Sequence, residues 1–300
     1  MRRWPVLALV LVGLGAAPAS GQGGFRSRCG AGVEAGQRTG STLLPVGTLF
    51  CPLVADPKAA STFASYVRGD FATLANAPAG TDTNIAAVGI SYGIGLLRIP
   101  AAAEGDGFQF GAEGAVFAQF NLDAPSFDLI NADYLVGLPL TLRIAGFSAR
   151  LRIYHQSSHL GDEYLLSEHP ERVNLSFESA ELILSQEMGP ARVYAGGEST
   201  FRRVPSSVAA RLGHAGLELR PASFGAGRLV AALDVKLVDD GDWKAAWSAR
   251  AGIEIARVPG TGGPSRVVSL LAHYYDGAAP YGQFYRENIR FYGIGLHFSL

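Results

Sequence analysis

Apolar side chains recur at every second position along most of this chain, and this period of two restricts the fold more than any other feature of the sequence. Strand side chains alternate between two faces, whereas a helix repeats its apolar positions about every 3.6 residues. The alternation is clearest at 130–142, 229–237 and 243–255, where one face is apolar and the other polar or small. We therefore expect an all-β protein from about residue 61 onward.

The N-terminal residues predict export. Arg2 and Arg3 give a positive start, Val6 to Leu14 an apolar stretch, and Ala16 to Gly21 the small residues that a signal peptidase accepts. These features indicate a cleavable signal peptide over residues 1–22. No later stretch approaches the ~18 apolar residues of a spanning helix, so membrane residence would have to come from strands.

Alternation alone does not separate a soluble sandwich from a membrane barrel, but the ends of the strands favour the barrel. Aromatic residues gather there, as in the girdles at membrane interfaces, and they include Trp243, Trp247, Tyr274, Tyr275, Phe284 and Tyr285. The last segment, Glu287 to Leu300, resembles the C-terminal strand by which outer-membrane barrels are recognised for assembly, although it ends in Leu instead of the usual Phe. We expect a transmembrane antiparallel up-and-down β-barrel in the bacterial outer membrane.

The segments give about twelve strands, with ten to fourteen as the range, in a barrel over residues 61–300. An even number returns both chain ends to the periplasmic side. The links at 143–146 and 187–190 are then periplasmic turns and 158–172 is an external loop, while the short links at 203–206 and 238–242 would also be external. The expected strands lie near 61–68, 84–98, 107–120, 130–143, 146–157, 173–186, 190–202, 207–219, 227–237, 243–257, 265–276 and 287–300.

Residues 23–60 precede the expected barrel as a Gly-rich periplasmic extension that either plugs it or lies beneath it. This extension holds both cysteines of the chain, Cys29 and Cys51. An even number of cysteines in an exported chain favours a disulfide between them. A metal site is less favoured, because no histidine lies in the same segment.

The charge balance argues against a nucleic-acid partner. The chain has 25 Lys and Arg against 26 Asp and Glu, with no basic run. A phosphate-binding Gly-rich loop, a dinucleotide fingerprint and a CxxC motif are also missing from the sequence. We expect outer-membrane lipid and the barrel assembly machinery as partners, and no cofactor unless the protein is a hydrolase, in which case calcium is possible.

Several segments resemble a bacterial family classed as domain of unknown function 1207, which looks like an outer-membrane family. They are LFCPLVADPK (Leu49 to Lys58), FNLDAPSFDLINADYLVGLPL (Phe120 to Leu140), YHQSSHLGDEYLL (Tyr154 to Leu166) and RVNLS (Arg172 to Ser176). With their spacing they cover most of residues 45–300. The resemblance implies an outer-membrane barrel but names no function, because the family has no assigned activity.

The densest group of reactive side chains is YHQSSHLGDEY, at the outer end of the fifth expected strand and the start of the long loop. Arg150 and Arg152 belong to the inward set of that strand, so continued alternation places His155 and Ser157 on the lipid-facing side. An imidazole beside a hydroxyl is costly at a lipid surface, which makes this pair a candidate for function.

This His-x-Ser arrangement is similar to the catalytic strand of outer-membrane phospholipase A and of outer-membrane lipid A deacylases. The resemblance implies that Ser157 attacks an acyl ester while His155 takes its proton and returns it to the leaving group. A third group should orient the ring, and the candidates are Asn174 on the neighbouring expected strand, Glu168 and Glu163.

Metal binding and a purely structural role are the alternatives for the same cluster. Asp162 and Glu163 would hold a calcium ion that serves the hydrolase. A separate metal site would use His155, His159, Asp162, Glu163 and His169, although an i, i+4 His pair suits a helix better than a strand. The structural alternative is that these groups form hydrogen bonds within an external loop or with lipopolysaccharide.

The inward-facing residues leave a third function open. Charges of both signs usually pair and fill a small barrel, whereas a narrow channel needs a continuous water-filled path. His214, His273 and His297 stand alone in separate strands and are interpreted as lumen or interface residues. The open functions are therefore a structural or envelope-associated barrel, which is the leading interpretation, a serine-type lipid acyl hydrolase and a narrow channel. The charged inward set comprises Arg150, Arg152, Arg192, Glu198, Arg202, Asp234, Lys236, Arg250 and Glu254.

Overall fold

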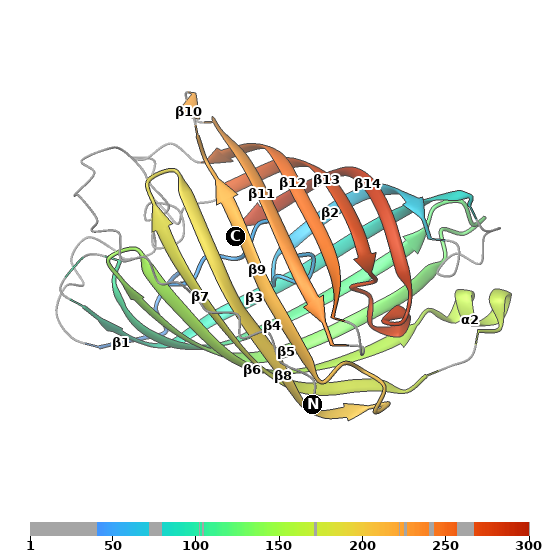
Figure 1. The fold of residues 1–300 in the computed structure, drawn as a ribbon, viewed down its shortest axis with the longest axis horizontal. Helices are drawn as coiled ribbons and strands as arrows, with labels where there is room; N and C mark the ends of the chain where they lie inside the picture. The colour runs from blue at the N-terminus through green and yellow to red at the C-terminus, as the bar shows by residue number, and fades with distance from the viewer. Residues whose placement is uncertain are drawn as a thin grey trace, which may run out of the picture.

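Twelve long strands form a closed antiparallel barrel in this computed structural model (Figure 1). The structure describes residues 41–71, 80–101, 103, 105–170, 173–221, 223–224, 227–239, 243–256 and 267–299. The long strands are β2 (Thr62–Asp70), β3 (Asp82–Pro100), β4 (Gly107–Asn121), β5 (Leu129–Ile144), β6 (Phe147–Leu160), β7 (Leu175–Met188), β8 (Ala191–Val204), β9 (Arg211–Leu219), β11 (Gly227–Val238), β12 (Lys244–Ala256), β13 (Val267–Ala278) and β14 (Asn288–Ser299).

Closure of the sheet comes from the pairing of the last strand with the first long one. β14 pairs with β13 on one side and with β2 on the other, and each remaining long strand pairs with its neighbours in the chain. Because no long strand is left at an edge, the backbone hydrogen bonds are satisfied within the barrel wall. The expected all-β barrel of about twelve strands is confirmed.

The short elements lie at the two ends of the barrel. The strands β1 (Thr42–Leu43) and β10 (Ser223–Phe224) lie at one end, whereas the helix α2 (Asp162–Glu168) lies at the other, which we call the α2 end (Figure 1). A 3-10 turn, η1 (Gly282–Phe284), also lies at the α2 end, between β13 and β14. Among the described residues, no helix is long and apolar enough to cross a bilayer.

The connections follow the expected alternation of ends. β5 joins β6 through residues 145–146 and β7 joins β8 through residues 189–190, both at the end opposite α2. The short link 205–210 lies at the α2 end, and so do the end of β11, the start of β12 and α2 itself. The expected count of twelve strands placed two short links at the same end as the long loop, and the strand ends in the structure agree with that placement.

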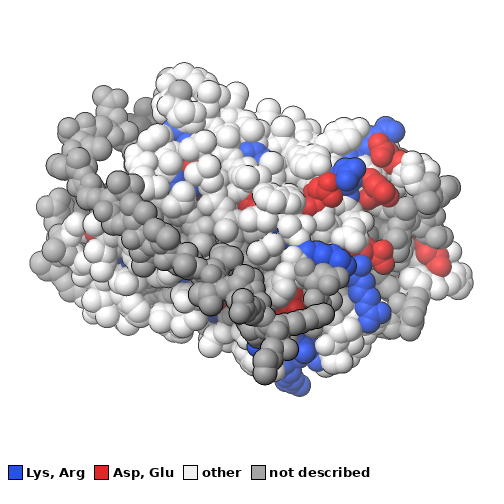
Figure 2. Space-filling view, viewed as in Figure 1, with Lys and Arg blue, Asp and Glu red and all other residues white. Residues whose placement is uncertain are grey.

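The alternation of each strand separates an apolar outer face from a polar inner one. On β6, Arg150 and Arg152 are buried in the lumen, whereas Leu151 and Ile153 are exposed on the outside. In Figure 2 the middle of the visible described surface carries few charged side chains, and most of those visible gather toward the α2 end. The prediction that Tyr275 and Phe284 belong to the aromatic girdle was wrong, because both are buried in the core of the α2 end.

The charged inner residues form ion pairs that fill the lumen. Glu181 accepts hydrogen bonds from Arg150 at 2.7 Å and from Arg152 at 2.8 Å, and Arg152 also pairs with Glu113 at 2.9 Å. Glu198 accepts a hydrogen bond from the Tyr154 hydroxyl at 2.5 Å. Such mutual pairing is what a small barrel with a charged interior needs, because an unpaired buried charge is costly.

Two of the three histidines that the sequence left isolated are in fact partners. His273 and His297 share a hydrogen bond between their Nε2 atoms at 2.9 Å. His214 lies against Asp234, with 2.6 Å between its Nε2 and the Oδ2 of Asp234. Their positions in the lumen agree with the sequence interpretation. The interpretation that each histidine stands alone was wrong, because strand register brings residues from neighbouring strands together.

The segment before β2 enters the lumen and is held there by arginines of the barrel wall. Four guanidinium groups donate to its backbone carbonyls: Arg98 to Gly47, Arg143 to Leu49, Arg192 to Cys51 and Arg250 to Val54, at distances from 2.8 to 3.4 Å. We call residues 47–60 the lumen segment. Its own charges are paired with the wall as well, Asp56 with Lys236 at 2.6 Å and Lys58 with Asp133 at 2.5 Å.

Some predictions fall on residues that are not described. The signal peptide over residues 1–22 and Cys29 both lie outside the described residues. The Cys29–Cys51 disulfide therefore stays a prediction, as does the role of residues 23–60 as one unit. Cys51 itself is buried within the lumen segment.

Candidate functional site

A row of polar side chains crosses the outer face of β6, β7 and β8 near the α2 end. His155, Glu178 and Arg202 are direct partners in the strand register, one from each strand. Outward-facing residues closer to the middle of the same wall are apolar, including Leu151 and Ile153. On β6 and β7 the row therefore begins the polar part of the outer face.

His155 and Glu178 form the central contact of this row. The Nδ1–H of His155 donates to the Oε1 of Glu178 across 3.0 Å, and the imidazole side chain is 47% exposed. A carboxylate that accepts from Nδ1 fixes the tautomer of the ring and leaves the opposite nitrogen, Nε2, as the basic one.

Ser157 lies two residues beyond His155 on the same face of β6, as the alternation predicted. Its register partners are Tyr134 on β5 and Ser176 on β7. The adjacent Ser158 points the other way, is buried, and donates to the carboxylate of Asp133. Of the two consecutive serines, it is thus Ser157 that shares the outer face with His155.

Arg202 is a correction to the expected inward set. The register of β7 and β8 shifts between Glu178 and Ser179, whose partners are Arg202 and Thr200, so Phe201 is an extra residue in the strand. A β-bulge of this kind reverses the side-chain alternation beyond it. Arg202 consequently lies outside, with its side chain 77% exposed and Nη1 3.6 Å from Glu178 Oε1.

The third member of the cluster differs from the residues considered in the sequence. Asn174 lies just before β7 begins, and Glu163 and Glu168 lie in α2. The carboxylate that meets His155 is instead Glu178, within β7. The signal that could have identified it is parity, since Glu178 lies on the outward set of its strand, but the sequence does not fix which residue of β7 faces His155.

The histidine-based metal site is not assembled. His155 and His159 lie four residues apart on one strand, which separates their backbones by about 13 Å, too far to share an ion. His169 caps the end of α2, beyond the strand. His159 instead packs edge-on against Tyr134, with ring centroids 5.7 Å apart.

The expected calcium ligands do not form a calcium cage. Asp162 and Glu163 occupy the first turn of α2, and both are exposed. Acidic residues are favourable there because the N-terminal end of a helix is positive. The helix end therefore explains their position, and a bound ion is not needed to explain it. Calcium takes six to eight oxygen ligands, and among the described residues the group of three metal-binding side chains that converges lies elsewhere.

That converging group is Asp56, His214 and Asp234, whose ligand atoms lie within 4.8 Å of one another in the lumen. Its two carboxylates already have partners within the protein. The ammonium of Lys236 lies 2.6 Å from Asp56, and the Tyr194 hydroxyl donates to Asp234 at 2.6 Å. We therefore interpret it as a structural ion-pair cluster.

The helix α2 is fixed to the barrel by Tyr164. Its ring packs edge-on against Phe284 of η1, with centroids 6.1 Å apart. Burial raises the pKa of the Tyr164 hydroxyl from its ordinary value near 10 to about 12, further from neutral pH. Tyr164 is therefore a packing residue that positions the loop after β6, and not a candidate base.

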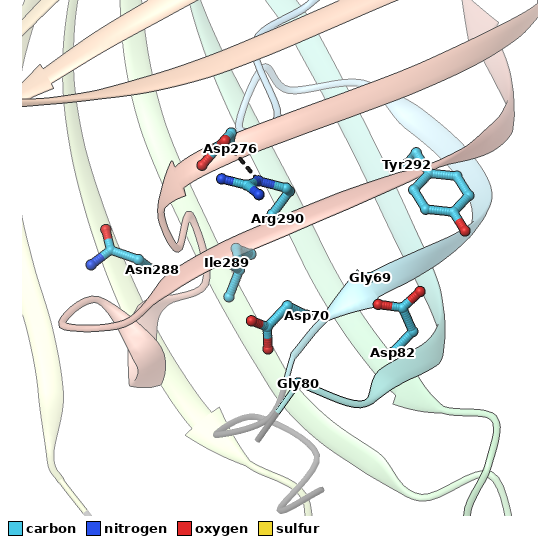
Figure 3. Close-up of a pocket in the computed structure, with 9 residues that line it drawn as sticks. All are labelled: Gly69, Asp70, Gly80, Asp82, Asp276, Asn288, Ile289, Arg290 and Tyr292. Carbon is cyan, nitrogen blue, oxygen red and sulfur yellow. Dashed lines mark hydrogen bonds and ion pairs between the residues drawn. The ribbon is translucent and has the colours of Figure 1, made fainter. Parts of the chain in front are cut away.

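A second row of polar residues borders a hollow of about 390 Å³ elsewhere on the outer surface of the α2 end (Figure 3). Asp276, Arg290, Asp70 and Asp82 are successive register partners on β13, β14, β2 and β3. The Arg290 Nε donates to Asp276 at 2.8 Å, and Tyr292 lies beside the row. This row has acidic and basic groups but no nucleophile paired with a base.

The fold and the first polar row together define an outer-membrane type of β-barrel whose outer wall carries a Ser-His-Glu arrangement. The chain belongs to the family described as a protein of unknown function, DUF1207, whose model matches residues 27–300. The family resemblance seen in the sequence is confirmed. None of the curated protein sequences matches this chain.

Solved phospholipase barrels have a similar fold. The outer membrane phospholipase of Salmonella typhi, a dimer with bound calcium, is 13% identical, and the match covers 91% of this chain and 98% of that one with a TM-score of 0.55. The outer membrane phospholipase A of Escherichia coli is also 13% identical, covering 83% and 93% with a TM-score of 0.54. At this identity the likeness shows the fold alone.

Proposed function

We propose that this protein is a serine-dependent lipid acyl-ester hydrolase of the bacterial outer membrane, exported by residues 1–22 and acting at the outer leaflet. The observation that carries the proposal is the 3.0 Å hydrogen bond between His155 and Glu178 on the lipid-facing wall, with Ser157 on the same face of the same strand. A nucleophile, a base and a group that orients the base are the parts that such a reaction requires.

The proposed reaction begins with proton transfer from Ser157 to Nε2 of His155 as Oγ attacks the ester carbonyl. The resulting imidazolium keeps its Nδ1–H bond to Glu178, whose negative charge stabilises it. Collapse of the tetrahedral intermediate breaks the bond to the alcohol, which takes the proton from Nε2. Water then attacks the acyl-serine by the same route, releasing a fatty acid and restoring Ser157.

The position of the cluster suits a lipid substrate. The row lies where the apolar wall, marked by Leu151 and Ile153, gives way to polar side chains. The ester groups of a lipid lie at the corresponding boundary between acyl chains and headgroups. The likeness to two phospholipase barrels adds support at the level of fold. Calcium takes part in no step of this proposed reaction, because the described residues expected to hold it do not converge.

A structural, envelope-associated barrel is the alternative function, and the filled lumen favours it. The arginines that bind the lumen segment and the buried ion pairs act on stability and not on chemistry. In that case the polar row would serve as a contact for lipopolysaccharide. The two functions differ in whether Ser157 reacts with an acyl ester.

The test measures fatty-acid release from phospholipid and from lipid A by the detergent-folded protein, with calcium and with a chelator. Ser157→Ala and His155→Ala should each lower release at least about 100-fold, and Glu178→Gln should lower it by a smaller factor. Ser176→Ala is the matched control, since it removes a serine hydroxyl from the outer face of the neighbouring strand and should retain activity.

Covalent labelling gives a second readout. A fluorophosphonate probe should modify Ser157 in the folded barrel and should fail to modify the Ser157→Ala variant. Absence of both labelling and release from folded protein would contradict the hydrolase and favour the structural barrel.

A further inference from the structure

We infer that Arg202 binds the phosphate group of the lipid substrate, so that this site selects phosphate-bearing lipids over neutral esters. The inference rests on the proposed hydrolase function. It starts from an arginine on the outer wall of a barrel, where a charged side chain is costly unless it reaches the headgroup level.

The β-bulge is the feature that puts this arginine beside the candidate nucleophile and base. Regular alternation from Thr200, whose hydroxyl bonds to the buried Ser179, would have turned residue 202 into the lumen. The extra residue Phe201 instead leaves Arg202 directly opposite Glu178. Bulges commonly occur next to active sites, where they redirect a side chain.

The geometry places the guanidinium within reach of a lipid bound at Ser157. The backbones of Arg202 and His155 are two strand spacings apart, about 10 Å. The arginine side chain spans half of that separation, because its Nη1 lies 3.6 Å from Glu178, the residue that also binds His155. The glycerol backbone of a phospholipid can bridge the half that remains, since it separates the acyl ester from the phosphate.

The contact with Glu178 leaves the arginine free to bind a ligand. A separation of 3.6 Å is longer than a normal hydrogen bond, and an exposed pair of this kind contributes little to stability. Arginine has five N–H donors in a planar fork, and this fork matches two oxygens of a phosphate. With 77% of its side chain exposed, Arg202 can present that fork outward.

Phe201 supplies the apolar half of the same recognition surface. It is 63% exposed and adjacent to Arg202. The bulge therefore leaves a ring and a guanidinium exposed at consecutive positions, an arrangement that fits an acyl chain and the phosphate of one lipid.

The first experiment compares dioctanoyl phosphatidylcholine with the neutral ester p-nitrophenyl octanoate. Arg202→Gln should lower kcat/KM for the phospholipid by about tenfold or more, mainly through KM, because a charge-assisted hydrogen bond is lost. Hydrolysis of the neutral ester should fall by a clearly smaller factor, because that substrate has no phosphate for Arg202 to bind. Arg202→Lys should recover part of the phospholipid activity, because it keeps the charge but not the fork.

The matched control is Arg290→Gln, which removes another exposed outer-wall arginine that pairs with a carboxylate, in the second polar row (Figure 3). It should leave the ratio of the two activities unchanged. Equal losses on both esters in Arg202→Gln would overturn the inference, since the arginine would then act without regard to phosphate.

The second experiment separates failure of this inference from failure of the hydrolase. Binding of dioctanoyl phosphatidic acid is measured in the Ser157→Ala background, with and without Arg202→Gln, and with inorganic phosphate as competitor. Binding that depends on Arg202 supports the inference even if no variant hydrolyses any ester, in which case only the hydrolase is contradicted. Binding independent of Arg202, or equal affinity for inorganic phosphate, would overturn it.

Discussion

Gly216 on β9 shows how closely single residues are fitted to the lumen. A β-carbon at this position would lie 2.2 Å from the Tyr194 ring and 2.6 Å from the Leu233 carbonyl oxygen. Tyr194 in turn donates to Asp234, which also contacts His214. The buried polar cluster therefore requires a residue without a side chain at this position.

Gly216→Ala should lower the free energy of unfolding by about 1–3 kcal/mol, because the added methyl group displaces the Tyr194 ring. Gly213→Ala on the same strand is the control, since its β-carbon would meet Leu237 at an ordinary 3.5 Å, and we expect a change within about 0.5 kcal/mol. Urea unfolding of the folded barrel, followed by tryptophan fluorescence, measures both. Equal effects of the two substitutions would show that the contact with Tyr194 is unimportant.

At the scale of elements, Asp133 on β5 joins three parts of the chain. Its carboxylate pairs with Lys58 of the lumen segment, accepts the hydroxyl of Ser158 on β6, and accepts the Gly282 backbone N–H of η1 at 3.1 Å. Asp133 is fully buried, and the side chain of Lys58 is 15% exposed. The attachment of the lumen segment therefore depends on a charge that has no access to water.

Asp133→Ala should destabilise the barrel by about 3–5 kcal/mol, because it leaves the Lys58 ammonium buried and unpaired. The double substitution Lys58→Met with Asp133→Leu should cost less than Asp133→Ala alone, since neither charge remains. A double-mutant cycle, completed with Lys58→Met and Asp133→Leu singly, gives the coupling energy in the same unfolding assay. Strict additivity of the single effects would contradict the importance of this pair.

For the whole molecule, we expect the lumen segment to determine whether the barrel can conduct. The four arginine-to-carbonyl hydrogen bonds and the ion pairs of Asp56 and Lys58 hold it against the wall along the barrel. A narrow channel needs a continuous water path, and this arrangement leaves buried protein groups in its place. The filled lumen thus argues against an open channel in the described structure.

The protein should therefore be silent in planar bilayers. Replacing Asp56 and Lys58 together by Ala removes both ion pairs of the lumen segment, and we expect intermittent conductance to appear. Arg68→Gln, which removes an exposed charge from the outer wall, is the control and should stay silent. Steady conductance by the unmodified protein would show that the lumen segment does not occlude the barrel.

Much of the fold could be predicted from local pattern. The period of two gave the twelve strands and the opposite faces of Arg152 and His155, since alternation depends only on neighbours along the chain. Glu178 could not be identified as the partner of His155, because strand register is set by turns and by pairing across the sheet. Arg202 was placed inside, since one extra residue in β8 is invisible to a count of alternating positions.

The sequence by itself determined that the chain forms strands, that each strand has an apolar and a polar face, and that His155 and Ser157 share the apolar side. Tertiary structure alone decided which residues meet: His155 with Glu178, His273 with His297, and the lumen segment with the arginines of the wall. The physical reason is that the face of a side chain follows from local backbone geometry, whereas its partners depend on register, bulges and closure of the barrel between residues far apart in the chain.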